Sequence, residues 1–182
     1  MSIFSPTTKR LISIRSSDRN QAFRKSAEAC SSAAVRTSGP ARMQKLDMDS
    51  AENLAKVERA VRGTRGVSRL RVNNAGLVMF HLTGPLRENV YSDPLTNAII
   101  VAEPEGENLR VDDVFCEDAV NLDDAVGAFG ERVKRAAFGF PPTQDENMER
   151  TRCTEVNTTL FVLKNAVDFF EKGLMFPVLS RA

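Results

Sequence analysis

The chain has 182 residues, 42% of them apolar, with eleven Phe, one Tyr and no Trp, and its formal net charge at pH 7 is +1. These values indicate a globular domain, and no apolar run approaches the ~20 residues that a membrane-spanning helix needs. Three widely spaced cysteines (Cys30, Cys116 and Cys153) favour free thiols in a reducing compartment over a disulfide framework or a zinc site.

Charge is distributed unevenly along the chain. Residues 1–45 contain nine Lys or Arg and two acidic residues, a net charge of +7, whereas the remaining residues carry −6. A segment rich in Arg and Ser and poor in acids is typical of an organellar presequence, which would place the protein inside a mitochondrion or plastid. Two alternatives stay open, and in both the protein would belong to the cytoplasm or a virion. The segment could be a disordered tail. It could instead be a basic arm that contacts nucleic acid or an acidic partner through Arg10, Arg15, Arg19, Arg24 and Lys25.

The first regular element after this extension is a helix over residues 47–62. Ser50 is placed to cap its start, Leu54, Val57 and Val61 recur on one face, and Gly63 can end it. The segment is therefore expected to cover part of an apolar sheet.

Residues 67–115 predict two β-hairpins in series. Four stretches have the alternation or the short apolar run of a strand, and turn-forming residues separate them at 73–76, 84–94 and 103–108. The expected strands are 67–72, 77–83, 97–102 and 109–115. Because short connections favour antiparallel neighbours, they should form a four-stranded meander with one face to bury.

Two further helices are expected after the sheet. Residues 121–138 carry apolar side chains at a spacing of three and four, with Asn121 as the cap, and residues 144–172 carry a heptad-like seam. The last ten residues are unusually apolar for a terminus, so they must pack on this body or on a partner chain. The side chains expected to make that contact are Leu174, Phe176, Val178 and Leu179.

The sequence therefore predicts an α+β fold in two parts. Residues 1–45 form a basic extension, and residues 46–182 form a single domain. In that domain a four-stranded antiparallel meander is covered by an N-terminal helix and two C-terminal helices.

No constellation of catalytic residues is evident. His81 is the only histidine and lies in an expected strand, so neither a Ser-His-Asp set nor a His-based metal site can be assembled. A Cys–His pair with Cys116 or Cys153 is formally possible, but nothing beside these cysteines indicates a tuned thiolate. The nine carboxylates between residues 103 and 124 lack the spacing of a calcium loop and indicate a solvated acidic face, or a docking site for a basic surface. We expect no cofactor and no bound metal.

One short segment has a resemblance to a known module. Gly127-Ala128-Phe129-Gly130, followed by apolar and basic residues, is similar to the Gly-x-x-Gly loop with which KH domains clamp an RNA backbone. The resemblance is confined to residues 126–134, and the two middle residues are Ala and Phe instead of basic or small polar ones. It implies an RNA contact at this loop.

These observations predict a non-catalytic structural or assembly subunit of a larger complex, in an organelle or in a viral or phage particle. Its partners would be other proteins, or further copies of this chain, contacted through the basic arm, the acidic run 103–124 and the apolar C-terminal tail. The alternative is a nucleic-acid-binding protein that uses the basic arm. An enzyme without a local motif is the third hypothesis, and a pocket that joins His81 to a cysteine or a carboxylate would favour it.

Overall fold

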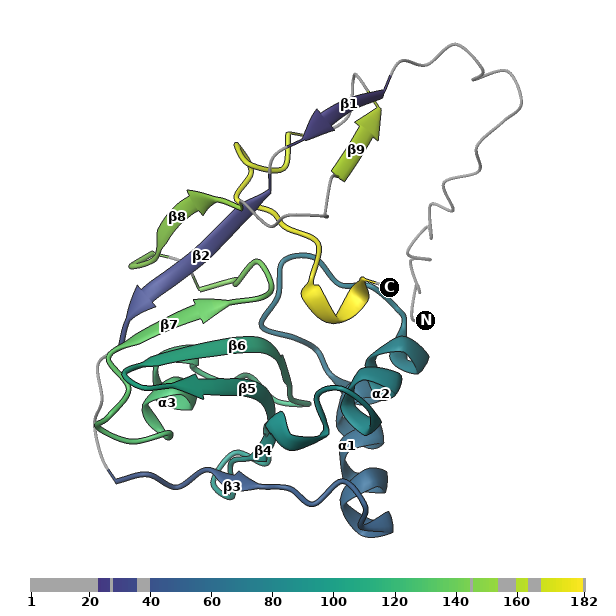
Figure 1. Ribbon diagram of the computed structural model, residues 1–182, viewed down its shortest axis with the longest axis vertical. Helices are drawn as coiled ribbons and strands as arrows, with labels where there is room; N and C mark the ends of the chain where they lie inside the picture. The colour runs from purple at the N-terminus through teal and green to yellow at the C-terminus, as the bar shows by residue number, and fades with distance from the viewer. Residues whose placement is uncertain are drawn as a thin grey trace, which may run out of the picture.

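The computed structural model describes residues 23–26, 28–35, 40–144, 146–153, 160–163 and 168–181 (Figure 1). In chain order its strands (β), α-helices and 3-10 helices (η) are β1 (Phe23–Ser26), β2 (Ala29–Ala34), β3 (Gln44–Lys45), α1 (Ala51–Gly63), α2 (Ala75–Thr83), η2 (Arg87–Asn89), β4 (Val90–Ser92), β5 (Ile99–Glu105), β6 (Asn108–Phe115), α3 (Leu122–Gly127), β7 (Arg135–Phe138), β8 (Glu149–Arg152), β9 (Leu160–Leu163) and η3 (Val178–Ser180).

Seven of these strands form one mixed sheet in the order β3-β4-β5-β6-β7-β2-β8. Neighbouring strands are antiparallel, except that β6 and β7 run parallel, with Val111 opposite Phe138. The connection between these two parallel strands contains α3, because parallel neighbours need a crossover. β1 and β9 form a separate two-stranded sheet beyond the start of β2 (Figure 1).

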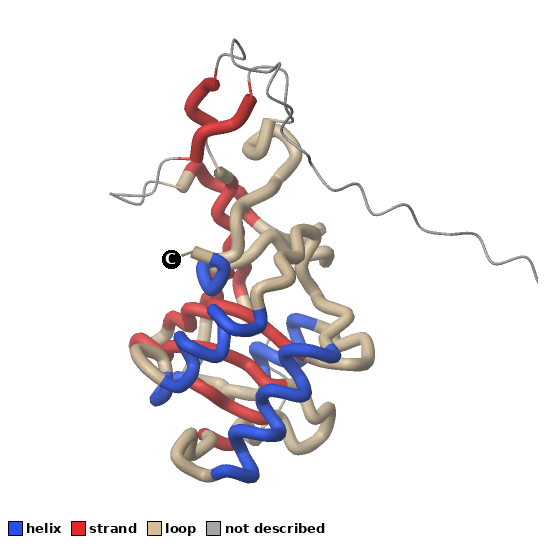
Figure 2. Tube along the Cα trace, turned by 90° about the vertical axis from the view of Figure 1, so that its right-hand side faces the viewer, coloured by secondary structure: helices blue, strands red, loops and turns tan. Residues whose placement is uncertain are grey.

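Helices lie on both faces of the sheet (Figures 1 and 2). Successive side chains of β5 point to opposite faces of the sheet. Ile100 packs in a core cluster with α3, whereas Ile99 and Val101 pack in a second cluster with α1 and α2. Val57 of α1 and Leu82 of α2 are completely buried in the second cluster. The sheet is therefore apolar on both faces.

The expected four-stranded meander under three helices is wrong, although the fold is α+β. Residues 135–138 form β7 where a helix over 121–138 was expected, and β8 and β9 fall inside the expected helix 144–172. In β7 exposed and buried residues alternate, which is the period of a strand. Apolar residues three or four positions apart occur only a few times in these segments, and so short a pattern does not separate a strand from a helix.

The first two expected strands are also wrong. Residues 77–83 belong to α2, where Val78 and Leu82 are buried and Phe80 is 64% exposed. This segment is apolar at almost every position, so its periodicity could not separate a strand from a helix. Residues 67–72 form a loop whose one β-bridge joins Ser68 to Pro142.

The elements with explicit local signals are confirmed. The hydroxyl of Ser50 accepts the N–H of Asn53 at the start of α1 (3.5 Å), and the side chain of Asn121 caps α3. The last two expected strands form the β5–β6 hairpin, whose turn contains Gly106 at φ +66°.

β2 lies within residues 1–45, yet it is an internal strand of the sheet, between β7 and β8. Ser31 pairs with Phe138 on one side, Cys30 pairs with Thr151 on the other, and Ala29 is completely buried. The expected domain boundary at residue 45 therefore does not separate these strands from the rest of the sheet.

Cys30 and Cys153 form a disulfide, with their Cα atoms 5.2 Å apart. The expectation of three free thiols is therefore wrong. The cysteines no longer favour a reducing compartment. Two cysteines 123 residues apart in the chain are brought together because β2 pairs with β8. Cys116 is a free thiol and is buried.

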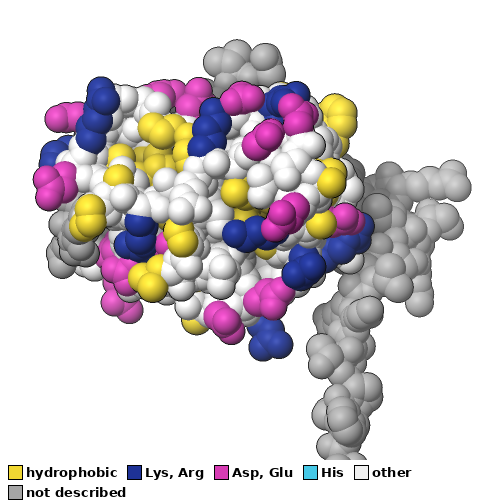
Figure 3. All heavy atoms as spheres, turned by 90° about the horizontal axis from the view of Figure 1, so that it is seen from below, with side chains coloured by type: hydrophobic (Ala, Val, Ile, Leu, Met, Phe, Trp, Pro, Cys, Tyr) yellow, Lys and Arg dark blue, Asp and Glu magenta, His cyan; other side chains and the backbone are white. Residues whose placement is uncertain are grey.

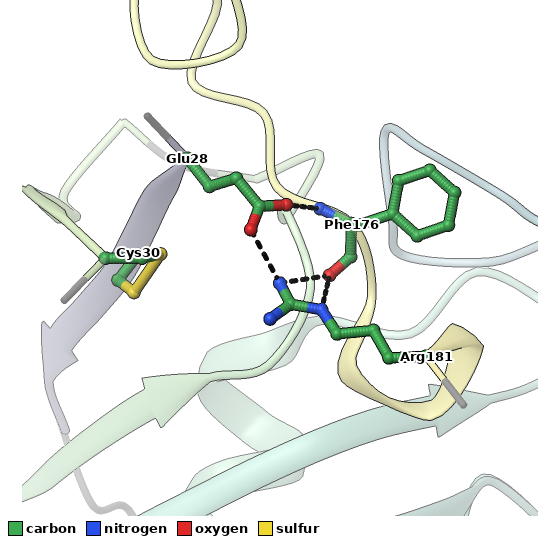
Figure 4. Close-up of a disulfide and its surroundings, with 5 residues drawn as sticks. Glu28, Cys30, Phe176 and Arg181 are labelled. Carbon is green, nitrogen blue, oxygen red and sulfur yellow. Dashed lines mark hydrogen bonds and ion pairs between the residues drawn. A yellow bond between two sulfur atoms is a disulfide. The ribbon is translucent and has the colours of Figure 1, made fainter. Parts of the chain in front are cut away.

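Residues 174–181, which we call the C-terminal strap, run from the start of β2, where the N–H of Ala29 donates to the carbonyl of Leu174, to the face that carries α1 and α2, where Leu179 is buried. Buried Glu28 fixes the strap by accepting the N–H of Phe176 and pairing with the guanidinium of Arg181 at 3.0 Å (Figure 4). The N–H of Val178 donates to the carbonyl of Gly139 (2.8 Å), and a Cβ on that glycine would lie 2.5 Å from Val178 Cγ2. The absence of a side chain at position 139 thus lets the strap reach the sheet.

Candidate functional site

The candidate site lies at the carboxyl end of β6, beside the loop that joins α1 to α2. Ligands of open α/β sheets bind outside the carboxyl ends of the parallel strands, and β6 and β7 are the parallel pair of this sheet. The loop between α1 and α2 crosses both strand ends. Its Arg65 N–H donates to the carbonyl of Cys116 after β6 (3.0 Å), and its Arg69 N–H donates to that of Pro141 after β7 (2.7 Å).

A β-bulge near the end of β6 places two acidic residues on one face. Val101 pairs with Asp113 and Ala102 pairs with Val111, so Asp112 is the extra residue. A bulge interrupts the alternation of side chains. Asp112 and Asp113 consequently both lie on the face covered by α1, α2 and the C-terminal strap, where they line two different cavities.

Asp113 lines a cavity of about 510 Å³, which we call the Asp113 cleft. Its walls are the end of α1, the α1–α2 loop, the start of α2, the last residues of β6 and η3 of the strap. Apolar side chains such as Val61, Val78 and Phe115 form part of the lining. The polar side chains that reach it include Thr64, Ser68, Arg71, Asn74, Asp113 and Ser180.

The pKa of Asp113 is raised to about 7, chiefly because burial disfavours the charged carboxylate. The backbone N–H of Val114, which donates to Oδ1 of Asp113 at 2.8 Å, opposes the shift. The negative charge of Asp112 raises the pKa further, and the positive charge of Arg71 lowers it. Asp113 therefore exchanges its proton near neutral pH, which makes it a candidate acid or base.

Two arginines line the Asp113 cleft: Arg62, whose guanidinium pairs with Glu58 at 2.8 Å, and Arg71. The side chain of Arg71 packs on the bare backbone of Gly66, where a Cβ would lie 3.2 Å from Arg71 Cδ. Gly66 has φ +74°, a conformation that favours glycine, so the turn requires that residue, and a side chain there would also displace Arg71 slightly. The loop thus positions a guanidinium in the same cavity as a carboxyl that can be neutral or charged.

Cys116 and His81 do not form a catalytic pair. Cys116 is buried in the core cluster that contains α3, and burial, followed by the charges of Asp118 and Asp113, raises the pKa of its thiol. A thiol with a raised pKa is a poor nucleophile at neutral pH. His81 lines the second cavity together with Asp112, which accepts from Arg110, and with Cys30, which is in a disulfide; its Nε2 is 3.1 Å from the carbonyl oxygen of Arg181. Cys153 has no free thiol because it is bonded to Cys30.

The residues expected to contact partners lie in different regions. Arg10, Arg15 and Arg19 are outside the described residues, and Arg24 and Lys25 lie on β1, paired with Val162 and Phe161 of β9. Of the apolar tail, Leu179 is buried, whereas Leu174, Phe176 and Val178 are half-buried within the strap. The tail packs on its own chain, and a contact with a partner stays a prediction.

The acidic run 103–124 is mostly exposed, as expected, whereas the loop similar to that of KH domains is covered by other residues of the chain. Six carboxylates of the run are exposed, as expected of a solvated face (Glu105, Glu107, Glu117, Asp118, Asp123 and Asp124), but Asp112 is buried.

In the Gly127–Gly130 loop the carbonyl of Ala128 accepts the N–H groups of Arg42 and Met43. A Cβ on Gly130 would lie 2.9 Å from Ala41 Cβ. The loop is thus covered by its own chain, which leaves it no room to clamp RNA.

Sequence reasoning missed Asp113, although a signal was present. Asp112 and Asp113 are consecutive acids inside the apolar run Val111–Phe115, where strict alternation allows only one of two neighbours to face solvent. Such a pair in the middle of a buried strand indicates a bulge or a buried carboxyl. The composition of the whole run 103–124 concealed it.

Comparison with known proteins finds no family model that matches the chain and no similar curated protein. Among the residues that the structure describes, no group of three His, Cys, Asp or Glu side chains could hold a metal ion. Within the same residues, no helix has the length and apolar character needed to cross a membrane.

Proposed function

We propose that the protein binds a small molecule with a carboxylate or phosphate group in the Asp113 cleft, and that Asp113 donates a proton to it. The observation that carries this proposal is the position of Asp113, a half-buried carboxyl that the bulge in β6 turns into a cavity at the carboxyl end of that strand. The volume of about 510 Å³ falls within the range of ligand pockets.

The charges of the cleft favour an anionic ligand. Arg71 lies in the cavity wall, and its planar guanidinium can hold a carboxylate or phosphate through two hydrogen bonds. A bound anion next to Asp113 disfavours the carboxylate form, so Asp113 enters the complex as a carboxylic acid. It can then pass its proton to an oxygen or nitrogen of the ligand, become a carboxylate, and regain a proton from water.

This proposal predicts that binding depends on Arg71 and on pH. Thermal unfolding would be followed with inorganic phosphate, acetate and a panel of small phosphorylated and carboxylated metabolites. A ligand that stabilises the native protein should bind at least ten-fold more weakly to Arg71→Met, whereas Arg59→Met, which removes an exposed arginine outside the cleft, should bind normally.

The affinity should also fall as pH rises from 6 to 8, because Asp113 loses its proton over this range. Asp113→Asn should remove that pH dependence while binding is retained. If no member of the panel binds, or if both arginine variants bind alike, the proposal is wrong.

A second candidate function is the assembly subunit expected from the sequence, and the β1–β9 sheet favours it. This sheet consists of four residue pairs, from Phe23–Leu163 to Ser26–Leu160, and a two-stranded sheet is marginally stable alone in water. In addition, all four residues of the edge strand β8 are exposed. A partner protein that adds to either edge would supply the missing contacts.

The assembly function predicts that the full chain forms a complex that depends on β1. Light scattering after size-exclusion chromatography should give a mass above the 20.1 kDa of one chain, and Arg24→Glu with Lys25→Glu should lower it. A monomer at all concentrations would contradict self-assembly.

The alternative, a nucleic-acid-binding protein, predicts that Arg24→Glu with Lys25→Glu reduces an RNA affinity that falls as the salt concentration rises. On the face of the body seen in Figure 3, Lys and Arg are interspersed with Asp and Glu, so this face offers no continuous basic surface to a nucleic acid. An organellar address stays a prediction, and the N-terminus of the mature protein would test it.

A further inference from the structure

A second cavity lies on the same face of the sheet as the Asp113 cleft, on the other side of η3. Pro177 and Ser180 line the Asp113 cleft, whereas Val178 and Leu179, which lie between them in the chain, line the second cavity. We call this cavity of about 530 Å³ the His81 groove.

The wall of the His81 groove is mostly apolar. Leu86 closes the side towards α2, Met175 and Leu179 of the strap are almost completely buried, and Ala137 of β7 remains exposed within the groove. A methionine is a flexible and polarisable contact for apolar ligands of irregular shape. Nothing in this part of the wall can form a hydrogen bond with a ligand through its side chain.

The charged side chains of the groove and its histidine have partners in the protein, and Ser31, Ser32 and Thr151 add only uncharged hydroxyls to the lining. Arg110 donates from Nε to Asp112 at 3.0 Å and pairs with Glu103 at 2.8 Å, and His81 Nε2 is 3.1 Å from the carbonyl oxygen of Arg181. A charged ligand would need to break one of these pairs, since a charge removed from water without a partner is strongly unfavourable. The groove therefore selects against charge.

We infer that the His81 groove binds a neutral apolar molecule, such as an aliphatic chain or an aromatic ring with at most an uncharged polar end. The strap holds one wall in place through the contacts of Glu28 with Phe176 and Arg181, which lie beside the disulfide (Figure 4). The inference does not depend on Asp113, because the two cavities have different polar groups and require ligands of opposite character.

The test measures binding of N-phenyl-1-naphthylamine, a neutral dye whose fluorescence increases in apolar surroundings, to the full chain. Binding should be saturable. 1-Decanol should displace the dye at a concentration at least ten-fold lower than decanoate or decylamine, which have chains of equal length and carry charges. Equal displacement by the charged molecules, or no saturable binding, would overturn the inference.

Two variants locate the dye. Ala137→Phe fills the groove from an exposed strand position and should weaken binding at least ten-fold, whereas Ala34→Phe, an equal change on β2 outside the groove, should leave it unchanged. Leu86→Ala enlarges the groove and should shift the preference from 1-decanol to 1-dodecanol, which tests the site even if Ala137→Phe does not fold. Binding that is unaffected by Ala137→Phe in a folded protein, or a chain-length preference unchanged in Leu86→Ala, would place the dye elsewhere and reject the groove.

Discussion

Replacing Asp113 with asparagine is expected to stabilise the folded protein above pH 7 by roughly 2–4 kcal/mol, because a tenfold change in acidity corresponds to about 1.4 kcal/mol. The pKa of Asp113 rises from an ordinary value of 3.8 to about 7 on folding, so the folded state holds this proton more tightly than the unfolded state does. The contribution of Asp113 to stability therefore falls as pH rises from about 4 to about 7, and it stays low above that range. The amide of the substituted side chain cannot ionise and can still accept the N–H of Val114.

Urea unfolding of the native protein and of Asp113→Asn, at half-unit intervals from pH 4 to pH 8.5, would measure this difference. The two free energies of unfolding should be similar near pH 4, diverge as pH rises to about 7, and keep a constant difference above that pH. Asp118→Asn is the matched control, because Asp118 is exposed and close in sequence, and it should show no such divergence. A variant that is less stable than the native protein at pH 8 would show that the carboxylate is stabilising and would contradict the assignment.

An expected gain in stability on removing a side chain also bears on function. Burial of a carboxyl without a direct ion pair lowers stability, and evolution retains such groups where activity requires them. The stabilised Asp113→Asn protein should accordingly lose the pH dependence of ligand binding.

Replacing Cys30 with serine is expected to cost about 3–5 kcal/mol of stability. A disulfide restricts the unfolded chain, and the effect grows with the length of the closed loop, here with a sequence separation of 123 residues. The loss should be largest around β8 and the strap, because the N–H of Cys153 donates to the carbonyl of Glu28, whose side chain holds the strap.

The measurement is urea unfolding with and without a reductant. The native protein under reducing conditions should match Cys30→Ser, and the reductant should have no effect on the variant. Hydrogen exchange would show whether the strap loses protection together with β8. Three titratable thiols in the denatured, unreduced protein would contradict the pairing of Cys30 with Cys153.

The parts of the fold that could be predicted have local chemical signals. Ser50 and Asn121 begin α1 and α3 because their side chains accept backbone N–H groups, and Gly106 forms the turn of the β5–β6 hairpin through its positive φ. Each of these signals acts within a few residues of its position. These local signals predict where two helices start and where one hairpin turns, but they do not predict the order of the strands in the sheet.

The remainder depends on contacts between distant residues. β2 is composed of Ala, Cys and Ser, which have weak strand propensity, and it becomes a strand because β7 and β8 pair with its two edges. Residues 77–83 become a helix because only Val78 and Leu82 need to face the sheet. The candidate site was missed for the same reason, since Arg71 and Asp113 meet only after the α1–α2 loop crosses the strand ends.

The internal position of β2 has a consequence for synthesis of the protein. This strand leaves the ribosome early, but β7 and β8 are translated more than 100 residues later, so the nascent chain must keep β2 unpaired for most of that interval. Until β2 docks, the β7 edge of the partly formed sheet is open and the two cysteines are apart. Co-translational chaperone capture should therefore be strongest just before β8 emerges.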